Sequence, residues 1–370
     1  MFAAGSPGSE ESPLAHRFRG ALLGGASGDA LGAAVEFMER TEILAWFGPG
    51  GIRDFVPVDG RLGAITDDTQ LTLFCAEAIL RAHATGARPD DVAAHAHEQS
   101  RSYLRWLLTQ GEAQPLLDAP RSWLMKHPDL FHRRGPGQTC LSSLRAMRSL
   151  GERAANASKG CGGVMRVAPI GLFHAHWYAP SASFDATVFR AGATDAALTH
   201  GHASGHLPAG FLALLTALLV ADVPLKDALE RSRIQLEAQP GHEQTAVAVE
   251  QALALAATDP LDPAQLASLG LGWFGEEALA MALYSAVGAE HAGADLETAV
   301  TLAVNHDGDS DSTGAITGSI LGALRGEQAI PARWLDHLEL RDLVATVADD
   351  LASVPRWLPD SAQRLRYSAG

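Results

Sequence analysis

The sequence has 370 residues, of which 47% are hydrophobic and 19% charged, a composition that supplies a sizeable core and excludes global disorder. Its 43 acidic residues outnumber its 28 basic ones, and the formal net charge of −15 repels nucleic-acid backbones and acidic membrane surfaces. Nucleic acid and membranes are therefore disfavoured as partners, and an anionic substrate would need local attraction from bound cations or helix N-termini.

The sequence predicts one domain between two short tails. Residues 1–13 contain acids and prolines but no basic stretch followed by an apolar one, so they favour a disordered tail over a secretory signal. No segment of 14–358 reads as a linker, and we expect a single domain there and a C-terminal tail at 359–370. Three cysteines without paired spacing favour a reducing compartment, the cytoplasm.

The first periodic segment is rich in glycine. Gly20, Gly24, Gly28 and Gly32 recur every four residues, so on a helix they form a smooth ridge that another helix can approach closely. Tight core packing is the simplest interpretation of this ridge. The segment is no dinucleotide fingerprint, because it lacks the G-x-G-x-x-G spacing and a preceding strand.

Most of the remaining chain has the 3.6-residue period of helices and few alternating strand-like runs, which predicts an all-α protein. The longest apolar run, at 207–221, contains a proline and is shorter than the roughly 20 residues that span a bilayer, so we expect a buried helix there. The clearest predicted helices cover 71–83, 141–150, 208–221, 245–257, 276–288 and 296–304.

Acidic clusters precede two of the apolar helical stretches. Asp67 and Asp68 follow Thr66, and some 240 residues later Asp309 and Asp311 precede another helix, with Asp307 two residues earlier. Helix capping explains one acid at a helix start. It does not explain several like charges within a few ångströms of one another, which need a nearby positive charge.

That positive charge is not supplied by neighbours in the sequence. Arg61 is the only Lys or Arg between positions 55 and 80, and none lies between 234 and 324. Carboxylate and hydroxyl oxygens suit hard divalent cations such as Mg²⁺, Mn²⁺ or Ca²⁺. If the two clusters face each other, they could hold a pair of ions that together position a water and a substrate.

Two single-cluster alternatives fit less well. An EF-hand loop beginning at Asp307 would need glycine at its sixth position and glutamate at its twelfth, where Ser312 and Gly318 stand. The haloacid-dehalogenase-type nucleophile motif also resembles 309–313. That motif opens a strand-rich α/β domain, however, and only about 60 residues follow it here.

Five segments in chain order resemble the ADP-ribosylglycohydrolase family, which includes dinitrogenase-reductase-activating glycohydrolases and ADP-ribosylarginine hydrolases. The resemblance covers about 15–330 and implies a compact single domain of orthogonally packed helices. The segments are GALLGGASGDALGAAVEF (20–37), ITDDTQLTLF (65–74), KGCGGVMRVAPIGLF (159–173), LTHGHASG (198–205) and HDGDSDSTGAITGSILGAL (306–324).

The resemblance implies two metal-binding trios, of which the first is Thr66, Asp67 and Asp68 and the second Asp309, Asp311 and Ser312. Family members often have threonine where Ser312 stands, and Thr313 is a neighbouring possibility. Glu36 matches a glutamate beside the metals on a mobile flap in some relatives, although it could equally be a solvated acid at a helix end. Some relatives use a further aspartate after the first trio, but no residue in 85–140 aligns with it.

Substrate-binding residues also follow from the resemblance. Gly160, Cys161, Gly162 and Gly163 match a loop that wraps the diphosphate and ribose, in which many relatives have asparagine or serine in place of Cys161. No base is evident that would activate this cysteine as a nucleophile, so we expect it to be a small loop residue. His200 matches a histidine near the phosphates. A zinc site made by His200, His202 and His206 is the less favoured alternative.

By resemblance, the chain is expected to remove ADP-ribose from an acceptor, most readily arginine on a protein, with two Mg²⁺ or Mn²⁺ ions as cofactors. We expect Asp68 or Glu36 to orient or deprotonate the attacking water. Expected partners are an ADP-ribosylated protein or a small-molecule conjugate, and a monomer is favoured. Alternatives are hydrolysis of ester-linked or serine-linked ADP-ribose, ADP-ribose binding without cleavage, and a crystallin-like structural role.

Overall fold

Helices make up the regular secondary structure of the residues that the computed structural model describes, which are 14–113, 115–116 and 121–368. In these ranges strand-like pairing is limited to two isolated bridges, so the all-α prediction is confirmed. The predicted disordered tail, 1–13, lies outside the described residues.

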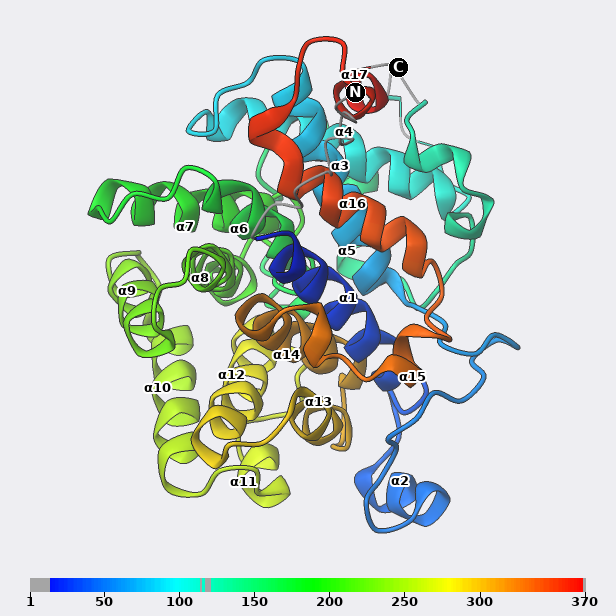
Figure 1. The fold of residues 1–370 in the computed structure, drawn as a ribbon, viewed down its shortest axis with the longest axis vertical. Coiled ribbons are helices and arrows are strands. Elements are labelled where there is room, and N and C mark those ends of the chain that lie inside the picture. Colours follow the sequence, from blue (N-terminus) through cyan, green and yellow to red (C-terminus); the bar gives the residue numbers. More distant parts are fainter. Residues whose placement is uncertain (1–13, 114, 117–120, 369–370) are drawn as a thin grey trace, which may run out of the picture.

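The helices are numbered in chain order and are labelled in Figure 1. The α-helices are α1 Ala15–Gly32, α2 Arg40–Phe47, α3 Asp67–Ala84, α4 Val92–Thr109, α5 Gln138–Ala146, α6 Ala168–Ala175, α7 Ala182–Ala197, α8 Ala203–Val220, α9 Leu225–Glu237, α10 Glu243–Thr258, α11 Pro263–Ala267, α12 Gly275–Ala292, α13 Leu296–Val304, α14 Ser310–Arg325, α15 Ala332–Leu335, α16 Arg341–Ser353 and α17 Ala362–Ser368. Short 3₁₀ turns cover Leu124–Lys126, Pro128–Leu130, Cys161–Gly163, Glu327–Ala329 and Val354–Arg356.

The six predicted helices are all present. The helix at 296–304 matches α13, and the others correspond to α3, α5, α8, α10 and α12. The prediction for 141–150 was placed too late, because α5 begins at Gln138 and ends at Ala146. Met147 and the residues after it leave the helix for the segment that leads to the glycine loop.

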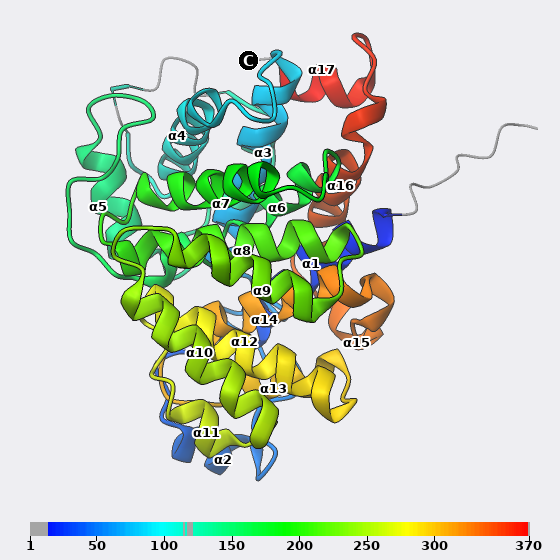
Figure 2. The same cartoon turned by 90° about the vertical axis from the view of Figure 1, so that its left-hand side faces the viewer.

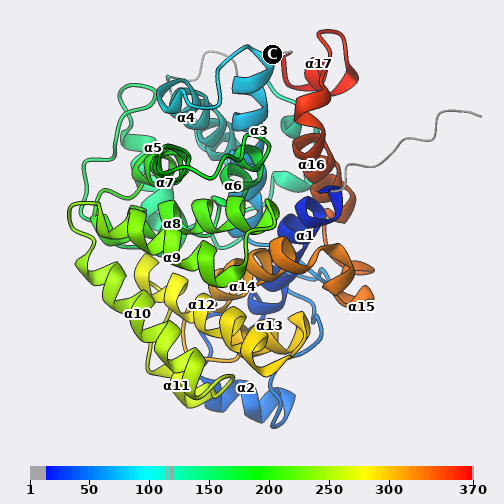
Figure 3. The same cartoon turned by 60° about the vertical axis from the view of Figure 1, so that its left-hand side comes forward.

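The apolar run at 207–221 forms most of α8. This is the one helix of the described residues that is long and apolar enough to cross a membrane, and 94% of it is buried inside the protein. It packs against α6, α7 and α9, which surround it in Figure 2 and, from another side, in Figure 3. The prediction of a buried helix is therefore confirmed.

The first long helix and one of the last lie side by side at the centre of the molecule. In Figure 1, α1 in dark blue runs beside α14 in orange, and this is the most extensive helix contact of the described chain. The glycine ridge of α1 faces glycines on α14: a Cβ atom added at Gly24 would lie 2.5 Å from the carbonyl oxygen of Gly318, and one at Gly28 2.0 Å from that of Gly314. Only residues without side chains allow this approach. It brings the C-terminal half of α1 against the beginning of α14.

Part of the predicted C-terminal tail is helical. Helix α17 lies within it, and the Tyr367 side chain is buried and donates a hydrogen bond of 2.8 Å to Asp350 on α16. Residues 369–370 lie outside the described ranges.

Candidate functional site

The first acidic cluster begins helix α3. Thr66 is the N-cap residue, and its hydroxyl oxygen accepts a hydrogen bond of 3.2 Å from the backbone N–H of Asp68. The Thr66 hydroxyl therefore caps the helix, and the cap does not need the carboxylates of Asp67 and Asp68. Asp67 and Asp68 are nonetheless buried, with 4% and 3% of their surface exposed.

The second cluster begins helix α14 in the same manner. Asp309 is the N-cap residue, and the backbone N–H of Ser312 donates to Asp309 at 3.3 Å and to Asp311 at 2.9 Å. The Thr313 hydroxyl bonds instead to backbone carbonyl oxygens, at 2.7 Å from Ala303 and 2.9 Å from Asp309. Ser312 therefore presents its hydroxyl to the site, and Thr313 serves the backbone.

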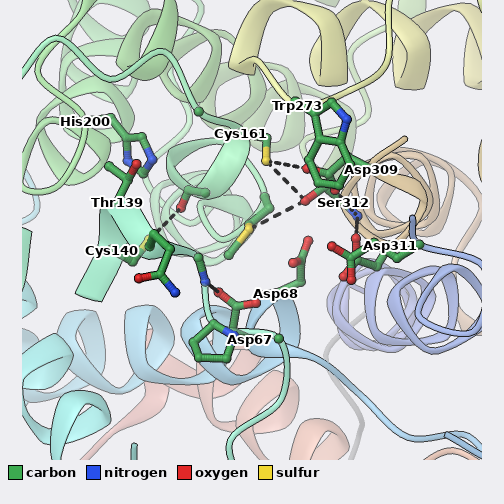
Figure 4. Close-up of a pocket in the computed structure, with 18 of the residues that line it drawn as sticks. Asp67, Asp68, Thr139, Cys140, Cys161, His200, Trp273, Asp309, Asp311 and Ser312 are labelled. Atoms are coloured by element: carbon green, nitrogen blue, oxygen red, sulfur yellow. Dashed lines mark hydrogen bonds between the residues drawn. The ribbon is translucent and has the colours of Figure 1, made fainter. Parts of the chain in front are cut away.

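Both clusters line one cavity of about 560 Å³, although 240 residues separate them in the sequence. In Figure 4, Asp67 and Asp68 point upward from α3 toward the same space that Asp309, Asp311 and Ser312 face from α14. The clusters also repel each other: burial raises the pKa values of Asp67 and Asp68 well above the usual carboxyl value, and the charge of Asp311 raises both further. The convergence expected from the sequence is thus present.

A further buried aspartate, which the sequence analysis did not single out, joins these acids. Asp29 lies on α1, next to Gly28 of the ridge, and is fully buried. Its carboxylate accepts hydrogen bonds from the backbone N–H groups of Thr66 at 3.0 Å and Thr69 at 3.1 Å, and from the Thr69 hydroxyl. Burial, and then the charge of Asp311, raise the pKa of Asp29 to about 7. Asp29 therefore fixes the start of α3.

These five aspartates, Asp29, Asp67, Asp68, Asp309 and Asp311, are called the acid centre below. Arg133 is the only Lys or Arg among the described residues that line the cavity, and its side chain is exposed, 3.8 Å from Glu112. The acid centre thus has no buried arginine or lysine to neutralise it in the described chain.

The acid centre has a feature that a bound cation would explain. Oδ1 of Asp68 is buried and has no hydrogen-bond partner, and buried carboxylates in a bare acidic cluster are strongly disfavoured without a positive charge. The described side chains include no group of three His, Cys, Asp or Glu residues already arranged around one point. Each predicted trio contains two carboxylates and one hydroxyl, so the donor chemistry fits a hard cation, and the two ions stay a prediction.

Glu36 reaches the cavity from the turn that follows α1. It is half-buried, and burial, followed by the charges of Asp311 and Asp309, raises its pKa to about 10. The next residue, Phe37, has a positive φ of 68° and stacks on Trp273 with ring centroids 5.3 Å apart. This stack joins the turn that carries Glu36 to the segment before α12, across the mouth of the cavity.

The glycine loop also lines the cavity, next to Trp273 and Asp309. Gly160, Cys161 and Gly162 line the cavity, and the backbone N–H of Cys161 is held by the carbonyl of Trp273 at 3.1 Å. Gly163 is not among the lining residues: a Cβ there would lie 2.6 Å from the carbonyl oxygen of Gly205, so this glycine serves packing against α8.

His200 is buried and also lines the cavity. Burial, and then the charge of Arg166, lower its pKa to about 3, so the ring is neutral, and its Nδ1 lies 2.9 Å from the Thr199 hydroxyl. His202 instead caps α8 by accepting from the Ser204 N–H at 3.0 Å, and His206 lies 3.2 Å from Arg153. The described histidines therefore offer no support for the zinc alternative.

The segment before α5 forms another part of the cavity wall. The backbone N–H of Asp67 donates to the carbonyl of Arg134 at 2.9 Å, and the N–H of Gly137 donates to Oδ2 of Asp67 at 3.1 Å. Thr139 and Cys140 follow on the cavity wall. None of the described residues of 85–140 that line the cavity is acidic, and Asp118 lies outside the described residues, so the role of a further aspartate stays open.

A second buried charge cluster, called the arginine centre, consists of Arg166, Asp195 and Tyr103. The Arg166 and Asp195 side chains are both fully buried and form an ion pair at 3.0 Å, and the Tyr103 hydroxyl donates to Asp195 at 2.6 Å. Nη1 of Arg166 also donates to the carbonyl of Gly162 at 3.2 Å. The arginine centre therefore supports the glycine loop from behind.

Several lining residues could not be selected from the sequence. Gln138, Thr139, Cys140, Met165 and Trp273 carry no pattern of their own. Asp29 does leave a signal, because a single acid inside an apolar, glycine-rich helix cannot face solvent if the ridge packs on a neighbouring helix.

The sequence and the fold are similar to those of known proteins. A family model described as ADP-ribosylglycohydrolase matches residues 10–359. A protein of Archaeoglobus fulgidus, described only as an uncharacterized protein, is 31% identical over 343 residues, which are 91% of this chain and 96% of that protein. ADP-ribosylarginine hydrolase Tri1 of Serratia proteamaculans is 43% identical over 53 residues, which are 14% of each chain.

A solved structure, described as an ADP-ribosylglycohydrolase-related protein complex, is similar over 92% of this chain and 98% of its own, with a TM-score of 0.64 and 26% identity. The family match and the shared fold both cover nearly the whole chain. This chain is therefore a glycosidic-bond hydrolase that belongs to the ADP-ribosylglycohydrolase family.

Proposed function

We propose that this hydrolase releases ADP-ribose from modified arginine side chains on proteins, in the cavity that Asp67, Asp68, Asp309 and Asp311 of the acid centre line. The observation that carries the proposal is a set of buried carboxylates without an internal counter-charge, facing a cavity of about 560 Å³. Pockets for small molecules commonly measure about 300–1,000 Å³. The arginine acceptor is supported by the short stretch of similarity to an ADP-ribosylarginine hydrolase.

Two divalent cations would be held by the trios of α3 and α14. Thr66, Asp67 and Asp68 form the first trio, and the second consists of Asp309, Asp311 and Ser312. When bound, such ions would neutralise the acid centre and bind oxygen atoms of the sugar and of a water. Asp29 would keep the start of α3 in place for the first trio, because it holds the N–H groups of Thr66 and Thr69.

Asp68 or Glu36 would take part in proton transfer from the attacking water. In the reaction, the water oxygen bonds to the anomeric carbon, the glycosidic bond breaks, and the acceptor leaves with a proton. Oδ1 of Asp68 has no hydrogen-bond partner in the described chain, so the carboxylate of Asp68, beside the proposed cation, could orient the water or accept its proton. Glu36 faces the cavity from the turn after the C-terminal end of α1 and is the second candidate.

The diphosphate would lie against the glycine loop. Gly160, Cys161 and Gly162 allow close approach to their backbone, and the neutral ring of His200 adds a polar contact without a charge. The arginine centre would keep this wall rigid by holding the carbonyl of Gly162.

Release of ADP-ribose from arginine-, serine- and ester-linked conjugates tests the proposal, each with Mg²⁺, Mn²⁺ or EDTA. We expect fastest release from the arginine conjugate, and loss of release in EDTA. Asp68→Asn should lower kcat by about 100-fold or more, since general acid–base groups contribute about 10²–10⁴. Asp360→Asn, at an exposed acid outside the cavity lining, is the matched control and should keep full activity.

Other outcomes select the alternatives. Faster release from the serine or ester conjugate would move the proposal to that acceptor. Tight ADP-ribose binding without release from any conjugate would show a binding protein, and neither binding nor release would favour a structural role.

We also propose that the protein works in a reducing compartment, as expected from its cysteines. The cysteines of the described chain, at positions 75, 140 and 161, are all free.

A further inference from the structure

Cys161 has a neighbour that a small loop residue would not need. Its Sγ lies 2.8 Å from Oδ2 of Asp309 and 3.6 Å from Oγ of Ser312, and Figure 4 marks both contacts. Asp309 and Ser312 are two of the three proposed ligands of the cation at α14. The sulfur therefore lies beside the oxygen atoms that would bind that cation.

The spacing suits shared ligation. Oxygen ligands lie at about 2.1 Å from a divalent transition metal and thiolate sulfur at about 2.3 Å, so an oxygen and a sulfur on one ion are about 3.1–3.6 Å apart. The two observed separations, 2.8 Å and 3.6 Å, differ from this range by a few tenths of an ångström or less. One ion could contact all three atoms with small side-chain movements.

Asp68 gives independent evidence for a ligand at this place. Only 3% of its surface is exposed, and its Oδ1 has no hydrogen-bond partner. In Figure 4 its carboxylate is directed into the space between Cys161, Ser312 and Asp311. A buried carboxylate oxygen without a partner indicates that something positive occupies this space in the working protein.

The two other cysteines have different surroundings. Cys140 lines the same cavity, but its Sγ lies 3.7 Å from Nη1 of Arg166 and 4.0 Å from the carbonyl of Gly162, next to a positive charge. Cys75 is buried 4.0 Å from Asp195 of the arginine centre. Only Cys161 is in contact with the acid centre.

We propose that the sulfur of Cys161 is a direct ligand of the cation bound by Asp309 and Ser312, as a thiolate whose proton leaves to solvent. This inference rests on the proposed function, because it requires that the α14 trio binds a cation. A thiolate favours Fe²⁺, Co²⁺ and Zn²⁺, whereas a purely oxygen site suits Mg²⁺. The second site of this chain is then selective for thiophilic divalent ions over Mg²⁺.

Cobalt absorption spectroscopy on the full chain tests the ligand directly. With Co²⁺ bound, the wild-type protein should show a sulfur-to-cobalt charge-transfer band in the near ultraviolet, together with visible ligand-field bands. Cys161→Ser should keep the ligand-field bands and lose the charge-transfer band. Cys140→Ser is the matched control from the same cavity, and it should keep both.

Calorimetry measures the selectivity. Cys161→Ser should weaken Zn²⁺ and Co²⁺ binding by at least about tenfold, because even outer ligand partners contribute about 10–100-fold to metal affinity. The Mg²⁺ affinity of the variant should stay within about threefold of wild type, since serine still offers an oxygen.

A charge-transfer band that persists in Cys161→Ser would overturn the inference, as would wild-type protein that binds Co²⁺ without such a band. In both results the cation site itself would stand. Wild-type protein that binds no divalent cation in calorimetry would overturn the metal centre of the proposed function as well.

A variant-free measurement covers the case in which Cys161→Ser does not fold. Cys161 is partly exposed, but burial and the charge of Asp309 raise the pKa of its thiol, so iodoacetamide should alkylate it slowly, on prolonged incubation at mildly alkaline pH, and mass spectrometry can locate the label. Zn²⁺ should protect Cys161 and Mg²⁺ should not. Equal labelling with both ions would count against the thiolate ligand.

Discussion

The acid centre and the arginine centre both bury carboxylates. Among the described residues, only the arginine centre has a buried cationic side chain that neutralises its carboxylate. In the arginine centre, Asp195 has a fully buried guanidinium at 3.0 Å and a tyrosine hydroxyl at 2.6 Å. Burial raises the pKa of Asp195, and Arg166 acts against that rise. In the acid centre, burial raises the pKa values of Asp67 and Asp68, and the neighbouring carboxylates raise them further.

This difference distinguishes a charge cluster that stabilises the fold from one that serves the proposed activity. A buried carboxylate that the chain itself neutralises contributes to holding helices together, here α4, α7 and the glycine loop. Several carboxylates that the described chain leaves without a buried cation are costly in an isolated fold. Such a cluster is retained when an external cation completes it. The following predictions test whether the two centres respond differently to the same perturbations.

Removing Arg166 should have the largest effect. Arg166→Met leaves Asp195 buried without its partner, and breaking a buried ion pair costs about 3–5 kcal/mol of the free energy of unfolding. Urea denaturation monitored by circular dichroism measures this loss. Divalent cations should stabilise Arg166→Met and wild type by equal amounts and leave the difference between them unchanged, because the cations bind at the other centre. A difference that shrinks when Mg²⁺, Mn²⁺ or Zn²⁺ replaces EDTA would contradict the separation of the two centres.

Adding a divalent cation should stabilise the wild-type protein by about 2.7 kcal/mol at a concentration of 100 times Kd, the value expected for a ligand that binds only the folded state. Asp68→Asn should show a smaller gain at the same concentration, since it loses a carboxylate ligand. Thermal unfolding in EDTA and in excess cation gives both numbers. An equal gain in the two proteins would remove Asp68 from the site.

The same comparison has a pH dependence whose sign follows from Asp29. Its pKa is raised from 3.8 to about 7 in the folded protein, so the folded state binds this proton more tightly than the unfolded state. This contribution to stability is fully present below pH 3.8 and is lost as the pH rises through 7. In EDTA, Tm should therefore fall between pH 5 and pH 8, and saturating cation should reduce that fall.

Two glycine substitutions should give the smallest but most selective effects. A Cβ at Gly28 would lie 2.0 Å from the carbonyl oxygen of Gly314, and one at Gly192 on α7 would lie 2.6 Å from that of Ala209. Both alanine variants should lose about 1–3 kcal/mol of stability from overpacking. Only Gly28→Ala should also weaken cation binding, because it moves Asp29 away from Asp311. Calorimetry of the two variants decides this point.

The fold and the two acidic trios were accessible from the sequence because their signals are local. Helical periodicity located α13 to the residue, and adjacent like charges at two helix starts were conspicuous without any structure. The early end of α5 was not accessible, because the backbone N–H groups after Met147 bond to side chains instead of continuing the helix: that of Arg148 donates to Glu152, and that of Gly151 donates to the Ser100 hydroxyl at 2.8 Å.

What sequence reasoning missed depends on long-range contacts. Asp29 becomes a member of the acid centre only because the α1 ridge packs on α14; its place in an apolar helix indicates burial, but not which residues lie beside it. The proximity of Cys161 to Asp309 joins residues 148 positions apart. Phe37 and Trp273 are even further apart in the sequence, so no pattern of residue spacing predicts that their rings stack.

The pairing of α1 with α14 also sets when this enzyme can mature on the ribosome. Helix α1 is synthesised long before α14, and its glycine ridge lacks its packing partner until residue 325 has emerged. A nascent chain halted before residue 310 carries Asp29, Asp67 and Asp68 without Asp309 and Asp311. The proposed cation site can therefore be completed only after α14 has been synthesised.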